Sequence, residues 1–174
     1  MNDTGYYYTH VPILSAAMTF TKGPVLELGS GLGSTLMLHG LCGAMNRELV
    51  TLESDEAWML KFINLGRSWH KFRYVKDFVN LPEYKQSWGL AFVDHGVAGD
   101  LEASKIRGHS VEMLQDVPVL VIHDTCWPWL YGYEKPLKLF KYRWDWRAQY
   151  TLWPQTSVVS KTINVSKIFA GFCL

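Results

Sequence analysis

The chain has 174 residues, with 17 basic and 16 acidic side chains and a formal net charge of +1. This length suits one domain over residues 1–174, and the balanced charge gives no global field toward nucleic acid or membranes. Its three widely separated cysteines match no zinc spacing, its first residues show no signal pattern, and no apolar run is long enough to span a bilayer. We therefore expect a cytoplasmic protein with reduced thiols.

A glycine-rich turn between a strand and a helix organises the first part of the chain. A helix is predicted over Pro12–Phe20, and an apolar strand over Val25–Leu28 follows it. The chain then breaks into alternating glycines and resumes as a predicted helix from Ser34 to about Met45. Such a unit holds a nucleotide-like ligand, because glycines allow close backbone approach and the helix N-terminus offers free N–H groups.

A second apolar strand, Leu49–Glu53, ends in an acid about 20 residues past the glycine loop, as expected for a ribose-binding carboxylate. A carboxylate accepts two hydroxyl hydrogen bonds at once, so we assign Glu53 to the ribose hydroxyls, with Ser54 beside it. The dinucleotide pattern G-x-G-x-x-G fails, because Ser34 stands where its third glycine belongs. The alternative is an ordinary strand-to-helix turn flanked by two solvated acids, Glu27 and Glu53.

The run Glu-x-Gly-x-Gly-x-Gly at residues 27–33 resembles motif I of the class I S-adenosylmethionine-dependent methyltransferases. The resemblance implies that Glu27 meets the amino group of S-adenosylmethionine, directly or through water. It also implies that the loop passes close to the methionine and ribose parts, through Gly29, Ser30, Gly31 and Gly33. In this family the segment before motif I often covers the site, which suggests His10 as a cofactor contact and Tyr8 as an acceptor contact. A helix cap beside a packed tyrosine cluster is the alternative for both.

Three more strands are predicted, at Phe72–Val75, Gly89–His95 and Val117–Thr125, with helices at Asp55–Leu65 and Leu101–Leu114. The late stretches Trp144–Trp153 and Ser157–Val165 suit an antiparallel pair at one sheet edge. Strands alternating with helices imply a doubly wound α/β fold with a mostly parallel sheet of about seven strands. The resemblance implies the same Rossmann-like methyltransferase fold. It also implies that Asp77 and Phe78 flank the adenine, with a simple turn acid as the alternative for Asp77.

Polar residues end the fourth and fifth strands, as Asp94-His95 and His123-Asp124. Ligands of open α/β sheets bind beyond the carboxyl ends of the strands, so we expect these four residues to be catalytic, with Asp94 also at the cofactor. His95 or His123 is expected to deprotonate the acceptor, since histidine titrates near neutrality. A hydrogen-bonded pair that closes the strand is the alternative for His123-Asp124.

Asp94 and Asp124 also resemble the metal acids of catechol-type O-methyltransferases. That resemblance implies a divalent ion such as Mg²⁺ on Asp94, Asp124 and Thr125. Thr125 stands where that family has Asn, however, and no lysine base follows Asp94 before Lys105. We therefore favour a metal-free site in which Asp94 and Asp124 converge at the methyl end of the cofactor.

The predicted function is methyl transfer from S-adenosylmethionine to an oxygen, or a nitrogen, of a small-molecule acceptor, with no membrane partner. Trp127 and Trp129 follow the site directly and are expected to contact the acceptor. The basic, aromatic segment Lys135–Arg147 keeps an RNA-directed methyltransferase open, although the net charge argues against nucleic acid. Missing helices before motif I keep open a cofactor-binding protein without methyl transfer, and the glycine spacing disfavours a dinucleotide oxidoreductase.

Overall fold

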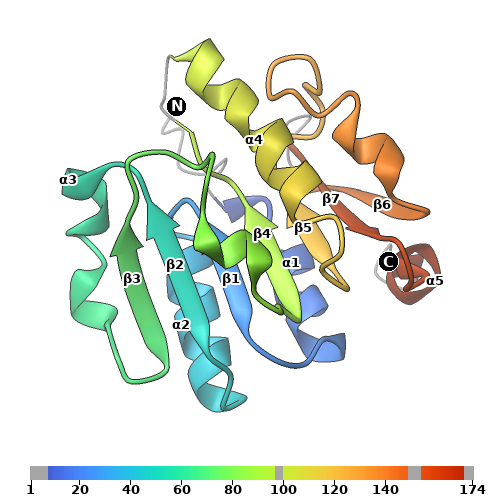
Figure 1. The fold of residues 1–174 in the computed structure, drawn as a ribbon. Helices are drawn as coiled ribbons and strands as arrows, with labels where there is room; N and C mark the ends of the chain where they lie inside the picture. The colour runs from blue at the N-terminus through green and yellow to red at the C-terminus, as the bar shows by residue number, and fades with distance from the viewer. Residues whose placement is uncertain (1–7, 97–99, 149–153, 171–174) are drawn as a thin grey trace.

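The computed structural model describes residues 8–96, 100–148 and 154–170, which form an α/β fold around a seven-stranded sheet (Figure 1). The strands are β1 (Val25–Leu28), β2 (Leu49–Glu53), β3 (His70–Tyr74), β4 (Leu90–Val93), β5 (Leu120–Ile122), β6 (Tyr142–Arg147) and β7 (Gln155–Ser160). The α-helices are α1 (Val11–Phe20), α2 (Ser34–Ala44), α3 (Glu56–Met59), α4 (Leu101–Met113) and α5 (Val165–Phe169). Short 3-10 turns are η2 (Ile63–Leu65), η3 (Pro82–Lys85) and η4 (Pro136–Leu139).

The strand order is β3-β2-β1-β4-β5-β7-β6, with β1 to β5 parallel and β7 antiparallel to both β5 and β6. This arrangement confirms the predicted fold class, including the antiparallel edge pair. The strand order reverses between β1 and β4, so the crevice at their carboxyl ends is where a doubly wound sheet binds its ligand.

Two apolar layers cover opposite faces of the sheet, as the alternation of side chains along each strand requires. Leu26 and Leu28 of β1 pack in the layer that includes residues of α4, whereas Val25 packs in the layer that includes residues of α1 and α2. Figure 1 shows α1 and α2 behind the strands and α4 in front of them. Burial on both faces explains why the central strands are almost entirely apolar.

The prediction of one helix over Asp55–Leu65 is wrong in its length, because the α-helix ends at Met59 and the 3-10 turn η2 follows it. Asp55 caps α3 by accepting from the backbone N–H of Trp58 at 2.9 Å. After the first turn, the N–H groups of Lys61 and Phe62 bond three residues back rather than four, to Trp58 and Met59. The segment therefore tightens into 3-10 geometry, which long helices do not sustain.

The last two strands begin two residues earlier than predicted, and residues 149–153 of the expected Trp144–Trp153 strand lie outside the described residues. Val165, predicted as a strand end, instead begins α5, whose N-terminus is capped by the side chain of Asn164. The fifth strand is also shorter than predicted, because only Leu120–Ile122 is assigned to β5.

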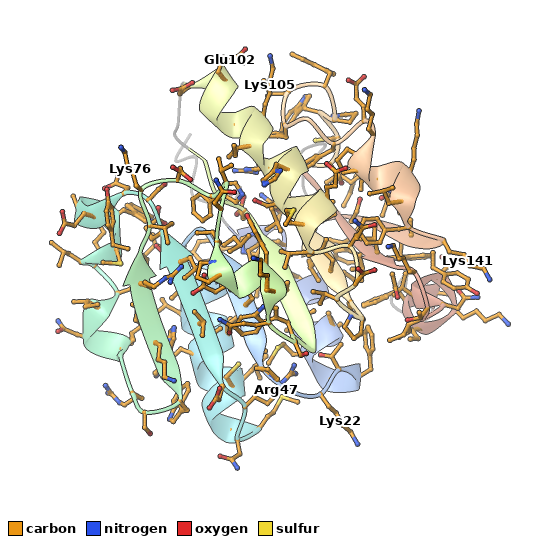
Figure 2. All side chains as sticks on the ribbon, viewed as in Figure 1. Lys22, Arg47, Lys76, Glu102, Lys105 and Lys141 are labelled. Carbon is orange, nitrogen blue, oxygen red and sulfur yellow. The ribbon has the colours of Figure 1, made fainter. Side chains whose placement is uncertain are left out.

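Charged side chains lie mainly at the periphery, as Figure 2 shows for Lys76, Glu102, Lys105 and Lys141. Arg47 is an exception, since it is buried and donates to backbone carbonyls of Met18, Thr21 and Gly23. Within the described ranges, every helix is too short or too polar to cross a bilayer.

Candidate cofactor and acceptor site

A cleft of about 900 Å³ opens at the carboxyl ends of the parallel strands. Its volume falls within the range of small-molecule sites. The structure brings most of the predicted site residues to this cleft: His10, Gly29, Ser30, Gly31, Glu53, Ser54, Asp94, His95, His123, Asp124 and Trp127. Residues that sequence reasoning missed also line it: Asp55, Trp58, Gly96, Arg107 and Pro154.

Gly29 makes the turn that forms the floor of the cleft. Its φ of +89° is in the region that favours glycine, and a Cβ there would lie 2.6 Å from the carbonyl oxygen of Asp94. The turn continues to Gly31, whose N–H donates to the hydroxyl of Thr35 in the first turn of α2 at 2.8 Å. A side chain at position 29 would therefore separate the loop from the end of β4.

Glu53 fastens the glycine loop to the end of β2. One carboxylate oxygen accepts from the N–H and the hydroxyl of Ser30, both at 2.8 Å. The other accepts from the N–H groups of Ser54 and Asp55, at 2.7 and 2.9 Å. These four bonds use the lone-pair capacity of a carboxylate. A ribose hydroxyl that bonds Glu53 must therefore replace the hydroxyl of Ser30, the one partner that leaves by rotating a side chain.

Glu27 does not reach the cleft. It shares the α2 side of β1 with Val25, is fully buried, and accepts from the hydroxyls of Thr35 and Thr51 at 2.7 to 3.1 Å. Burial raises the pKa of its carboxyl group to about 7, although the hydroxyl donors oppose the shift. We expected Glu27 to meet the cofactor's amino group, directly or through water. The structure instead places Glu27 beneath the glycine loop, outside the cleft.

An ionised cluster forms the other wall of the cleft. Nη1 of Arg107 donates to Asp124 at 2.9 Å and lies 3.2 Å from Asp94. Nδ1 of His123 lies 3.2 Å from Asp94 and 3.4 Å from Asp124. Asp124 has a φ of +59°, a conformation that costs free energy in residues other than glycine and often occurs at functional sites. The structure thus brings Asp94 and Asp124 together, from neighbouring strands.

Charge pairing shifts the pKa values in this cluster away from neutrality. Burial alone would lower the pKa of His123, but Asp94 and Asp124 raise it to about 10. Burial alone would raise the pKa of each carboxyl group, but His123 and Arg107 hold both below their usual values. At neutral pH the cluster therefore contains two carboxylates and two cations.

The other two cleft histidines are neutral. His10 is buried, with both ring nitrogens unpartnered among the described residues, and burial together with the charge of His123 lowers its pKa to about 4. Burial and then Arg107 lower the pKa of His95 well below its usual value, and its Nε2 pairs with the hydroxyl of Ser110 at 2.8 Å. His95 and His123 thus lack the near-neutral pKa expected of a histidine base.

Several predicted site residues lie away from the cleft. Asp77 is exposed and accepts from the N–H of Val79, and Phe78 is buried in a stack on the ring of His95. Thr125 is buried and pairs with Gln155 and Ser157. The predicted site residues that do not line the cleft are Tyr8, Glu27, Gly33, Asp77, Phe78, Thr125 and Trp129.

The predicted metal set of Asp94, Asp124 and Thr125 does not fit a divalent ion. Thr125 is turned toward β7, and the guanidinium of Arg107 already lies between the two carboxylates. His10, Asp94 and His123 form another group whose ligand atoms all lie within 4.8 Å of one another. In that group the proton on His123 opposes coordination, because metal binding requires a neutral imidazole.

The sequence patterns did not identify Arg107 as a site residue, because it lies on a helix rather than at a strand end. The signal was its position, since Ser104, Arg107, Val111 and Leu114 recur at helical spacing and are all buried. A charged residue on a buried helix face requires a partner of opposite charge. Trp58, inside the helix predicted over Asp55–Leu65, is also part of the site, because its indole N–H donates to the carbonyl of Ser30 at 2.7 Å and fixes the glycine loop.

Comparison with known proteins supports the fold assignment. No family model matches the chain, and no curated protein matches it. A methyltransferase structure from Pyrococcus furiosus has a TM-score of 0.61 at 16% identity, over 88% of this chain and 83% of its own. Precorrin-6y C5,15-methyltransferase from Geobacter metallireducens gives 0.53 at 10%, over 93% and 97%. An rRNA methylase from Streptococcus thermophilus gives 0.50 at 12%, over 87% and 95%. The chain therefore has the Rossmann-like fold of these methyltransferases.

Proposed function

We propose that this protein is an S-adenosylmethionine-dependent methyltransferase that acts on an oxygen, or alternatively a nitrogen, of a small-molecule acceptor. The observation that carries the proposal is a single cleft with two chemically different walls. One wall is the glycine turn fastened by Glu53, and the other is the ionised cluster of Asp94, Arg107, His123 and Asp124. The fold shared with methyltransferases that have different acceptors supports methyl transfer in general.

The glycine wall suits the cofactor. Gly29 allows the loop to turn against β4, and Glu53 offers a carboxylate to hydroxyl groups once the hydroxyl of Ser30 rotates away. Trp58 and Asp55 extend this wall beyond the loop. A glycine turn at the carboxyl end of β1 suits a nucleoside ligand, because it allows close approach of the ligand at the point where the strand order reverses.

The ionised wall suits the acceptor. Bound S-adenosylmethionine supplies an activated methyl group on a positively charged sulfur, and catalysis then needs an aligned acceptor that gives up a proton. Asp94 and Asp124 are ionised and can accept a hydrogen bond from an acceptor hydroxyl. His10 adds a neutral ring beside Asp94 and His123, and its two nitrogens have no hydrogen-bond partner among the described residues. Asp94 is the more exposed acid, with 23% of its side chain accessible against 13% for Asp124.

The basic segment at Lys135–Arg147 favours the small-molecule acceptor over RNA. Lys135, Lys138 and Lys141 are exposed and do not line the cleft, and Figure 2 shows Lys141 projecting outward. Arg143 pairs with Asp145 at 2.7 Å, which neutralises part of the segment. A path for a nucleic acid strand requires cations that lead into the site, and these cations do not.

Transfer of a labelled methyl group tests the proposal. The protein and S-adenosylmethionine with a labelled methyl group are incubated separately with a protein-free small-molecule extract and with total RNA. We expect label in the small-molecule fraction, lost in Asp94→Asn and retained in Asp116→Asn, a surface acid paired with Lys161. Label in RNA alone would support the RNA-directed alternative. Cofactor binding with no transfer to any fraction would support a binding protein without activity.

A further inference from the structure

Arg107 is held in the candidate site by contacts on several sides. Its Nη1 contacts Asp124 and Asp94, and its Nε donates to the backbone carbonyl of His95. The ring of Tyr131 lies 4.4 Å from the guanidinium carbon, in a cation–π contact. Only 9% of the side chain is accessible. These contacts fix the guanidinium in one position inside the site, which an arginine on the protein surface does not require.

Gly108 shows that the backbone is shaped to bring these contacts together. It lies inside α4, where glycine is less favourable than alanine. A Cβ at this position would overlap the carbonyl oxygen of Gly132, and the N–H of Gly108 donates to the carbonyl of Tyr131 at 2.9 Å. The missing side chain therefore lets the Tyr131 segment lie directly against α4, where the Tyr131 ring covers Arg107.

Two carboxylates that converge from neighbouring strand ends repel each other unless a cation lies between them. A hard divalent ion is one such cation, and a guanidinium is another, because its N–H groups match carboxylate oxygens. We infer that Arg107 is the built-in cation of this site, and that its guanidinium occupies the place between Asp94 and Asp124 where a divalent ion would otherwise bind. The place of the cation follows from these contacts alone. Its consequence, acceptor chemistry without a bound metal, rests on the proposed function.

The position of Arg107 supports this inference. Its Nη1 lies 2.9 Å from Asp124 and 3.2 Å from Asp94, so a divalent ion between the two carboxylates would lie against the guanidinium. In a largely buried cluster the Coulomb repulsion between two such cations is weakly screened.

Binding of Mn²⁺ tests the inference without any need for cofactor or turnover. Spin-resonance and calorimetric titrations are made on wild type, Arg107→Lys and Arg107→Ala, after circular dichroism has shown which variants are folded. We expect no stoichiometric binding by wild type or Arg107→Lys. Arg107→Ala should bind one Mn²⁺ at least about ten times more tightly than wild type, because the two carboxylates then lack a cation. The double variant Arg107→Ala with Asp94→Asn should lose this binding.

Guanidinium provides a second readout on Arg107→Ala. Guanidinium chloride far below denaturing concentrations should raise the midpoint of thermal unfolding of this variant, whereas sodium chloride and urea at equal concentration should not. The inference is overturned if wild type binds one Mn²⁺, Co²⁺ or Zn²⁺ ion and Asp94→Asn abolishes that binding, whether or not His10→Ala abolishes it as well. A folded Arg107→Ala that binds no Mn²⁺ would also overturn it. If Arg107→Ala does not fold, the wild-type titration alone decides.

Discussion

Replacing Glu27 by glutamine should change how the stability of the protein depends on pH. Burial raises the pKa of Glu27 from 4.5 to about 7. Each unit corresponds to about 1.4 kcal/mol, so ionising Glu27 in the folded protein costs about 3 kcal/mol more than in the unfolded chain. Because the folded state binds the Glu27 proton more tightly than the unfolded chain does, protonation of Glu27 stabilises the folded protein. This stabilisation is fully present below the unfolded pKa of Glu27 and is lost as the pH rises from about 4.5 to about 7.

Denaturant unfolding of wild type and Glu27→Gln, at a series of pH values across this window, measures the effect. The comparison is needed because His70, linked to Glu27 through Thr51, changes stability in the opposite direction. Burial lowers the pKa of His70 to about 4, so its contribution to stability rises with pH up to its ordinary pKa of about 6.5. The difference between the two proteins removes this shared contribution. Identical pH dependence in both would refute a neutral, buried Glu27.

Further predictions concern the cleft. Glu53→Ala should weaken S-adenosylmethionine binding by about 1–3 kcal/mol in calorimetry, because loop and ligand donors lose their acceptor, and unchanged affinity would contradict the assignment. Gly31→Val should stay folded by circular dichroism yet lose cofactor binding. Gly29→Ala should also lower the unfolding temperature, because position 29 has a φ of +89° and a Cβ there would meet the backbone of Asp94 and His95, just after β4. Equal unfolding temperatures would contradict this distinction. The pH–rate profile should show no inflection near pH 6.5, since the pKa is about 10 for His123 and about 4 for His10. An inflection there that disappears in His123→Asn would contradict the charge assignment.

The cleft walls could be predicted from sequence because they rest on local patterns. Glycine spacing located the turn at Gly29, and apolar strands that end in polar residues located Glu53, Asp94 and Asp124. Parallel strands bring such ends to one edge of a sheet, so convergence followed from the fold class alone. The sequence could therefore identify this edge without knowledge of any side-chain contact.

Other features depended on packing that the sequence does not express. Glu27 lies on the same face of β1 as Val25, and only the structure shows that α2 covers that face and separates Glu27 from the cleft. Arg107 reaches Asp124 from a helix 17 residues earlier in the chain, so no local spacing connects them. The pKa values of the histidines depend on these contacts. Because the sequence does not show the contacts, it led us to expect histidine bases with ordinary pKa values.

Calorimetric titration of the wild-type protein with S-adenosylmethionine, its demethylated product and NAD tests whether the cleft binds a sulfonium cofactor. We expect S-adenosylmethionine or its product to bind at one site per chain, and we expect no binding of NAD. S-adenosylmethionine and its product should compete, because both occupy the wall built from Gly29 and Glu53. Binding of NAD with no binding of S-adenosylmethionine or its product would contradict this assignment.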